Sequence, residues 1–177
     1  MHWLLNLAAF YLGWFVCVVG AARGQLWLGP ALVAAFLLAH VYRSRDPRHE
    51  TRLILVVALF GFTFDTLLAS AGLFSFARTS IAAWLSPPWM VALWMIFATT
   101  LNASLAWLDQ RRALAAALGA LSGPASYVAG ARLGAIELPA NALASLIGLA
   151  LAWAFAMPAL LWINQNLRTS APCASSK

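Results

Sequence analysis

The sequence predicts an all-α protein, a polytopic membrane helix bundle of six transmembrane helices with both termini in the cytoplasm. Composition is the first reason: 63% of the 177 residues are hydrophobic and only 9% are charged, whereas a soluble domain carries about 25% charged residues. The second is a series of apolar runs close to the roughly 20 residues that cross a bilayer. The third is an uneven distribution of arginine and lysine between alternate loops, which predicts the orientation.

The predicted spans follow one another with only short connections. They are residues 3–21, 25–42, 53–72, 88–108, 113–132 and 140–163. The mean hydropathy of the chain is +0.82, and no stretch is polar enough for a separate soluble domain. We therefore expect a single transmembrane domain over residues 1–166 and a short polar cytoplasmic tail over residues 167–177.

The first run lies where a secretory signal would lie, but it has no positively charged start and is longer than the apolar part of such a signal. We expect it to remain as a helix. The second run carries Gly29-Pro30 in its first turns, where proline is tolerated. The third run contains a carboxylate, Asp65, which carries most of the functional argument below.

The second half of the chain starts with an interrupted segment, residues 73–87, which we expect to be an interfacial connection carrying Trp84. Pro87-Pro88 then suits the start of the fourth helix. The fifth run is the least hydrophobic, and Gly123-Pro124 interrupts it. If the chain consisted of two inverted three-helix halves, this pair would correspond to Gly29-Pro30, an arrangement typical of transporter binding sites.

Arginine and lysine alone predict which side of the membrane each loop occupies. With six spans, one side would hold the termini and two loops, which together carry Arg43, Arg45, Arg48, Arg52, Arg111, Arg112, Arg168 and Lys177. The other side would carry Arg23, Arg78 and Arg132. This asymmetry places both termini in the cytoplasm.

Several partner and cofactor classes are not expected. The isoelectric point is near 10.4, but the basic residues lie between apolar runs and form no continuous face, so we expect no nucleic-acid partner. The two cysteines, Cys17 and Cys173, have no spacing typical of a metal or redox site. We expect no metal and no cofactor, and the lipid bilayer as the principal partner.

Asp65 is the most informative single residue because it lies deep in an apolar run. A charged side chain at the centre of a spanning helix costs roughly 2.5–3.5 kcal/mol. Gly61, Asp65, Leu68 and Gly72 share one helical face by their spacing. Glycines beside a carboxylate allow a neighbouring helix to approach closely, so we expect this face to lie inside the bundle.

Helical rise predicts which polar residues lie at the depth of Asp65, roughly 10 Å below the external surface. On this basis the candidate intramembrane polar site comprises Asp65, Trp94, Thr99, Ser126 and Tyr127, with Asn102 deeper toward the cytoplasm. Such a site could accept a proton or bind a cation. The structural alternative is a hydrogen bond that fixes helix register, because serine and threonine in membrane helices commonly bond to their own backbone.

Four stretches carry a family pattern: GWFVCV (13–18), the helix around Asp65, PPWMVALWMIFATTLNASLAWL (87–108) and SGPASYVAGARLGA (122–135). Its most specific parts are Pro88-Trp89 with Leu93-Trp94 and Phe97, and Gly123-Pro124 with Ser126-Tyr127 and Gly130. With them the chain, from Asn6 to about Pro158, resembles the bacterial inner-membrane family catalogued as domain of unknown function 2878. The resemblance implies a multi-pass protein of the bacterial inner (cytoplasmic) membrane. It also implies that Asp65, Trp94 and Tyr127 are family features, and it implies no established activity.

Three functions remain open at this stage. One is a small transporter-like protein with a protonatable site at Asp65, which would need to form a homo-oligomer to leave room for alternating access. The second is a membrane-embedded enzyme or accessory protein in lipid or fatty-acid modification, with a hydrophobic or lipid-like ligand. The third is an assembly or scaffold subunit. A polar cavity around Asp65 would favour transport, a greasy acyl-shaped cavity would favour lipid chemistry, and no cavity would favour a structural role.

Overall fold

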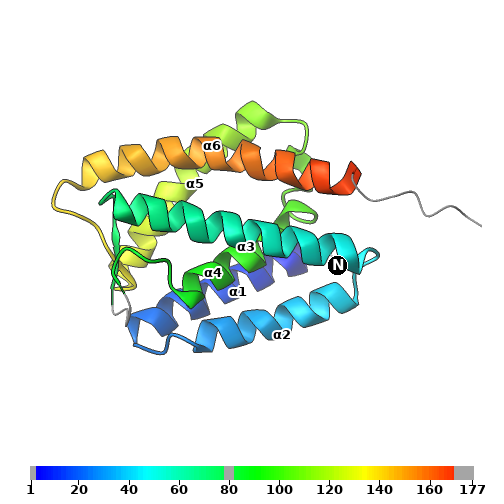
Figure 1. Ribbon diagram of the computed structural model, residues 1–177, viewed down its shortest axis with the longest axis horizontal. Coiled ribbons are helices and arrows are strands. Elements are labelled where there is room, and N and C mark those ends of the chain that lie inside the picture. The colour runs from blue at the N-terminus through cyan, green and yellow to red at the C-terminus, as the bar shows by residue number, and fades with distance from the viewer. Residues whose placement is uncertain (1–2, 78–81, 170–177) are drawn as a thin grey trace, which may run out of the picture.

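Six helices confirm the predicted all-α class in the computed structural model, which describes residues 3–77 and 82–169 (Figure 1). The helices are α1 (Trp3–Ala22), α2 (Leu28–Tyr42), α3 (Pro47–Ser70), α4 (Pro88–Leu101), α5 (Arg112–Arg132) and α6 (Ala142–Thr169). Two short strands, β1 (Ser75–Phe76) and β2 (Ile136–Glu137), and a 3-10 turn at Ala106–Leu108 lie between them. The start of α1 and the end of α6 lie at the same end of the bundle, here called the terminal end.

Four of the helices, α1, α3, α5 and α6, are long and apolar enough to cross a membrane, so the chain is a membrane protein. The other two are shorter than the spans predicted for 25–42 and 88–108: α2 has 15 residues and α4 has 14. At 1.5 Å per residue, α4 is about 21 Å long. That is less than the roughly 30 Å of a hydrocarbon core.

The predicted fourth span ends early, and polar side chains lie where the helix stops after Leu101. Thr99 and Thr100 donate their hydroxyl groups to the carbonyls of Ile96 and Phe97. Asn102 then makes side-chain hydrogen bonds to other helices. The apolar run through residue 108 is therefore a helix followed by a turn.

The core of the bundle is α4, in which nine residues are buried despite its short length. It packs against α1, α2 and α3, and α5 packs closely along α6. Helix α3 contacts both α4 and α6 and so joins the two groups. This arrangement leaves α1 and α5 on either side of α4 without extensive contact between them.

At the end opposite the termini, two loops are joined by backbone pairing. Strands β1 and β2 are antiparallel, with Ser75 opposite Glu137 and Phe76 opposite Ile136. The segment predicted as an interfacial connection thus carries β1, and Trp84 within it is exposed. Pairing of the loops fixes the ends of α3 and α5 relative to each other, which positions the site described next.

The arginines separate along the bundle axis as the sequence predicts. Among the described residues, the terminal end carries Arg43, Arg45, Arg48, Arg52, Arg111, Arg112 and Arg168, and the opposite end carries Arg23 and Arg132. Arg78, Lys177 and most of the predicted tail lie outside the described residues. Assignment of the terminal end to the cytoplasm stays a prediction.

Candidate ligand-binding site

Asp65 lies on the inner face of α3 and is completely shielded from solvent, with 0% of its surface exposed. Gly61, one turn earlier, is also buried. A methyl group at Gly61 would lie 1.9 Å from Cγ of Trp94, so the missing side chain is what lets the indole reach α3. The part of the predicted face around Gly61 and Asp65 thus receives Trp94, whereas Gly72 lies beyond the end of α3 and is exposed.

Two neutral donors from other helices bind the carboxylate. The indole Nε1 of Trp94 on α4 donates to Oδ2 of Asp65 at 2.6 Å. The hydroxyl of Tyr127 on α5 donates to Oδ1. The indole N–H of Trp153 on α6 is buried beside this group and makes no hydrogen bond within the described residues.

A stack of aromatic rings holds these donors in place. The indoles of Trp94 and Trp153 lie face to face, with ring centroids 5.2 Å apart and planes 10° from parallel. Phe64 meets both of them edge to face. Gly123 allows the stack on the α5 side, since a methyl group there would lie 2.3 Å from Cγ of Trp153. The ring positions are therefore set by packing from four helices.

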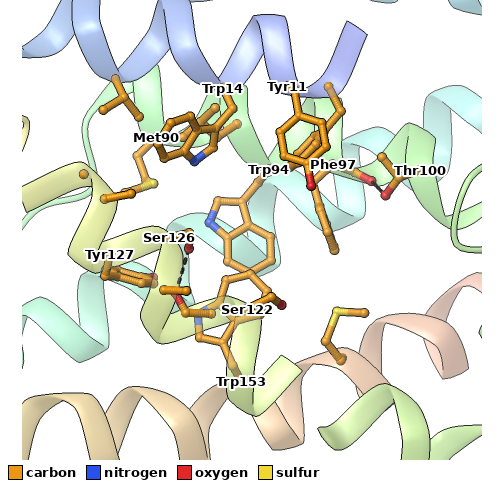
Figure 2. A pocket seen from close by; sticks show the side chains of 18 of the residues that line it. Tyr11, Trp14, Met90, Trp94, Phe97, Thr100, Ser122, Ser126, Tyr127 and Trp153 are labelled. Atoms are coloured by element: carbon orange, nitrogen blue, oxygen red, sulfur yellow. Dashed lines mark hydrogen bonds between the residues drawn. The ribbon is translucent and has the colours of Figure 1, made fainter. Parts of the chain in front are cut away.

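A groove of about 560 Å³ runs beside this stack, between α1 and α5 and over α4 and α6. Figure 2 shows Trp94 at its centre, Tyr11 and Trp14 reaching from α1 on one side, and Tyr127 and Trp153 on the other. Its volume falls within the roughly 300–1,000 Å³ typical of ligand pockets. Its aromatic lining residues are Phe10, Tyr11, Trp14, Trp89, Trp94, Phe97, Tyr127 and Trp153.

The groove is long, apolar and open along its side. On α5 its lining extends from Leu118 to Gly130, about 18 Å at the helical rise. Tyr11 on one rim and Ser122 and Ala125 on the other are exposed. These helices have the length and hydropathy of membrane spans, so an opening between them would face lipid. Asp65 is the sole charged residue among the described residues that line the groove.

The structure brings together three of the predicted site residues and separates the others. Asp65, Trp94 and Tyr127 are hydrogen-bonded. Ser126 lines the same groove, but its hydroxyl donates to its own helix at Gly123. Thr99 lies elsewhere, where it accepts a 3.0 Å hydrogen bond from Asn6 of α1.

Asn102 belongs to a second group of polar residues at the terminal end, here called the Asn102 cluster. Its amide nitrogen donates to Glu50 of α3 at 2.8 Å, and its oxygen accepts from Asn164 of α6 at 2.8 Å and from Arg168. Glu50 also pairs with His40 of α2 at 3.1 Å. The cluster thus joins α2, α3, α4 and α6, and Asn102 and Asp65 belong to separate sites.

Sequence reasoning missed Trp153, Glu50 and the groove itself. Glu50 lies only three residues before the predicted start of the third span, so it was counted with the polar loop, yet it is 8% exposed. Trp153 lies in the middle of an apolar run, away from the interfaces that tryptophans favour in membrane proteins. That central position was the available signal. Within the described residues, no group of three or more His, Cys, Asp or Glu is placed to hold a metal ion.

Substitution Tyr127→Phe tests the hydrogen bond to Asp65 with almost no change in volume. Removing one donor from a buried carboxylate is expected to cost about 1.5–3 kcal/mol. Thermal unfolding in a neutral detergent, followed by circular dichroism, would show a lower midpoint. Tyr11→Phe is the matched control, since Tyr11 is 61% exposed, and its midpoint should stay unchanged. Equal midpoints for the two variants would contradict the bond.

A family model described as "Protein of unknown function (DUF2878)" matches residues 3–159. No curated protein matches the chain, and no solved structure matches it. The match covers all of the first five helices and much of the sixth, including every residue of the Asp65 site. The chain therefore belongs to the DUF2878 family of proteins of unknown function.

Proposed function

We propose that the protein binds a lipid-like amphiphile from the bilayer in the groove between α1 and α5. The observation that carries the proposal is the character of this cavity: about 560 Å³ lined mainly by aliphatic and aromatic side chains, with one carboxylate in its wall. An apolar chain of a ligand would replace lipid contacts along α1 and α5, and Asp65 would recognise a polar group. The ligand class, not a reaction, is what this geometry supports.

The lining favours an amphiphile over a small hydrophilic solute. A hydrated ion or sugar needs several polar partners, but the serine and threonine hydroxyls in the wall are already used. Ser122 and Ser126 donate to carbonyls of their own helix, and Thr100 does the same on α4. The transporter-like function predicted from the sequence would therefore be movement of such an amphiphile between the bilayer and the groove.

Photolabelling tests the proposal directly. The probe is hexadecanol carrying a diazirine in its chain, irradiated with the purified protein in maltoside micelles, and labelled peptides are located by mass spectrometry. We expect labels on the groove faces of α1, α4 and α5. Ala125→Phe places a ring at the rim of the groove and should remove most of this labelling.

The matched control for Ala125→Phe is Leu151→Phe. Leu151 is 69% exposed on α6 and does not line the groove, so the added ring should leave the labelling pattern unchanged. Labels spread evenly over all outward-facing helices, with no response to Ala125→Phe, would contradict a binding groove.

A further inference from the structure

We propose that the groove selects amphiphiles with a positively charged head, such as a long-chain ammonium. This inference rests on the proposed function and names the ligand class of the same site. Its basis is a buried carboxyl group without a basic partner. Asp65 forms no ion pair in the described part of the chain, and no lysine, arginine or histidine is among the described residues lining the groove.

The partners of Asp65 stabilise a carboxylate without neutralising it. Trp94 and Tyr127 are neutral donors. Ionised Asp can accept at about four lone-pair positions, of which these donors use two. A cation placed near a buried carboxyl group favours its ionised form.

The ring lining supplies the second element of cation recognition. Tryptophan binds cations on its ring face better than tyrosine or phenylalanine, and aromatic cages are the usual means of binding quaternary ammonium groups. Trp14 on α1 lies on one side of the groove and Trp94 on α4 at its centre (Figure 2), with Trp153 stacked on Trp94. An ammonium head among these rings would be separated from the carboxylate by the side chains that shield it, in a medium where charge attraction is only weakly screened.

The other two head types fit less well. An anionic head, such as a fatty-acid carboxylate, would meet Asp65 with a like charge inside the low-dielectric bundle. A hydroxyl could donate one hydrogen bond but would leave the charge of Asp65 in place. The lining therefore predicts the affinity order ammonium, alcohol, carboxylate for a constant chain.

The experiment compares three dodecyl compounds that differ only in their heads. Tritiated dodecyltrimethylammonium is bound to the immobilised full-length protein in maltoside micelles, and unlabelled dodecyltrimethylammonium, dodecanol and dodecanoate compete. We expect the ammonium compound to compete at least about tenfold better than the alcohol, as attraction to a weakly screened charge implies. Dodecanoate should compete least.

Variants then assign the preference to Asp65. In the Asp65→Asn variant, the ammonium compound should compete no better than dodecanol. Glu50→Gln removes the carboxylate of the Asn102 cluster, which lies on the same helix, and this variant should still prefer the ammonium compound. If Asp65→Asn does not fold, Asp65→Glu is used instead. It keeps a carboxyl group at this position and should keep the affinity order ammonium, alcohol, carboxylate. Competition among the three dodecyl compounds on the unaltered protein tests the proposal without any variant.

The outcomes separate this inference from the proposed function. Equal competition by all three compounds, still blocked by Ala125→Phe, would overturn the charge selectivity and leave the groove as a binding site. Tighter binding of dodecanoate would also overturn it. No saturable binding of any dodecyl compound would overturn the proposed function itself.

Discussion

Gly61→Ala is expected to destabilise the protein by about 3 kcal/mol or more, at or above the upper end of the usual cost of overpacking a core. The added methyl group would lie 1.9 Å from Cγ and 2.1 Å from Cδ2 of Trp94. The indole has little freedom to retreat, because it is stacked on Trp153 and bonded to Asp65. The clash would therefore separate α3 from α4 or break the bond to the carboxylate.

Thermal unfolding in detergent measures this effect, and Gly148→Ala is the matched control. Gly148 also lies inside a helix, but a methyl group there would meet only the mobile end of the Leu73 side chain, at 2.9 Å. Alanine favours a helix over glycine by about 0.8–1.0 kcal/mol, so this variant should be neutral or slightly stabilised. An unchanged midpoint for Gly61→Ala would show that the indole does not occupy the position described.

Asn102→Ala is expected to have an effect of similar size at the other end of the bundle. One side chain there serves Glu50, Asn164 and Arg168. Its removal leaves a buried carboxylate short of a donor and a buried amide without its acceptor. Each orphaned buried group costs about 1–3 kcal/mol, so the total loss for the two groups should be about 2–6 kcal/mol.

The control for Asn102→Ala is Gln110→Ala, eight residues later in the same connection between α4 and α5. Gln110 is exposed and makes no side-chain hydrogen bond. Unfolding midpoints of both variants and of the unaltered protein would be compared in the same detergent. If Asn102→Ala and Gln110→Ala had equal midpoints, the Asn102 cluster would not hold α3, α4 and α6 together.

The sequence predicted those parts of the candidate site for which a single free-energy cost outweighs all others. Asp65 was identified because an unpaired charge in an apolar run is expensive, and its glycine neighbour indicated a buried face. Trp94 and Tyr127 followed from depth, since helical rise predicts height along the membrane normal. Their resemblance to a family pattern supported the same residues.

Depth along the membrane normal was not enough to place Thr99 and Asn102, because it does not tell which side of the helix a residue faces. Thr99 follows Trp94 by five residues and so points to a different side, where it meets Asn6 of α1. Asn102 lies beyond the end of α4 at Leu101, whereas the hydropathy pattern predicts that this helix continues to residue 108. Hydropathy reports the burial of a segment but not whether its backbone remains helical.

By itself the sequence determined the class of protein, the existence of six helices and the presence of one carboxylate that needs partners inside the bundle. These properties follow from short-range quantities: residue hydropathy, helical period and insertion cost. Only the tertiary structure decided that Trp153 stacks on Trp94, that Asn102 belongs to a separate cluster, and that α1 and α5 leave a groove between them. A groove is a space between helices far apart in the chain, so its shape depends on packing that no local pattern encodes.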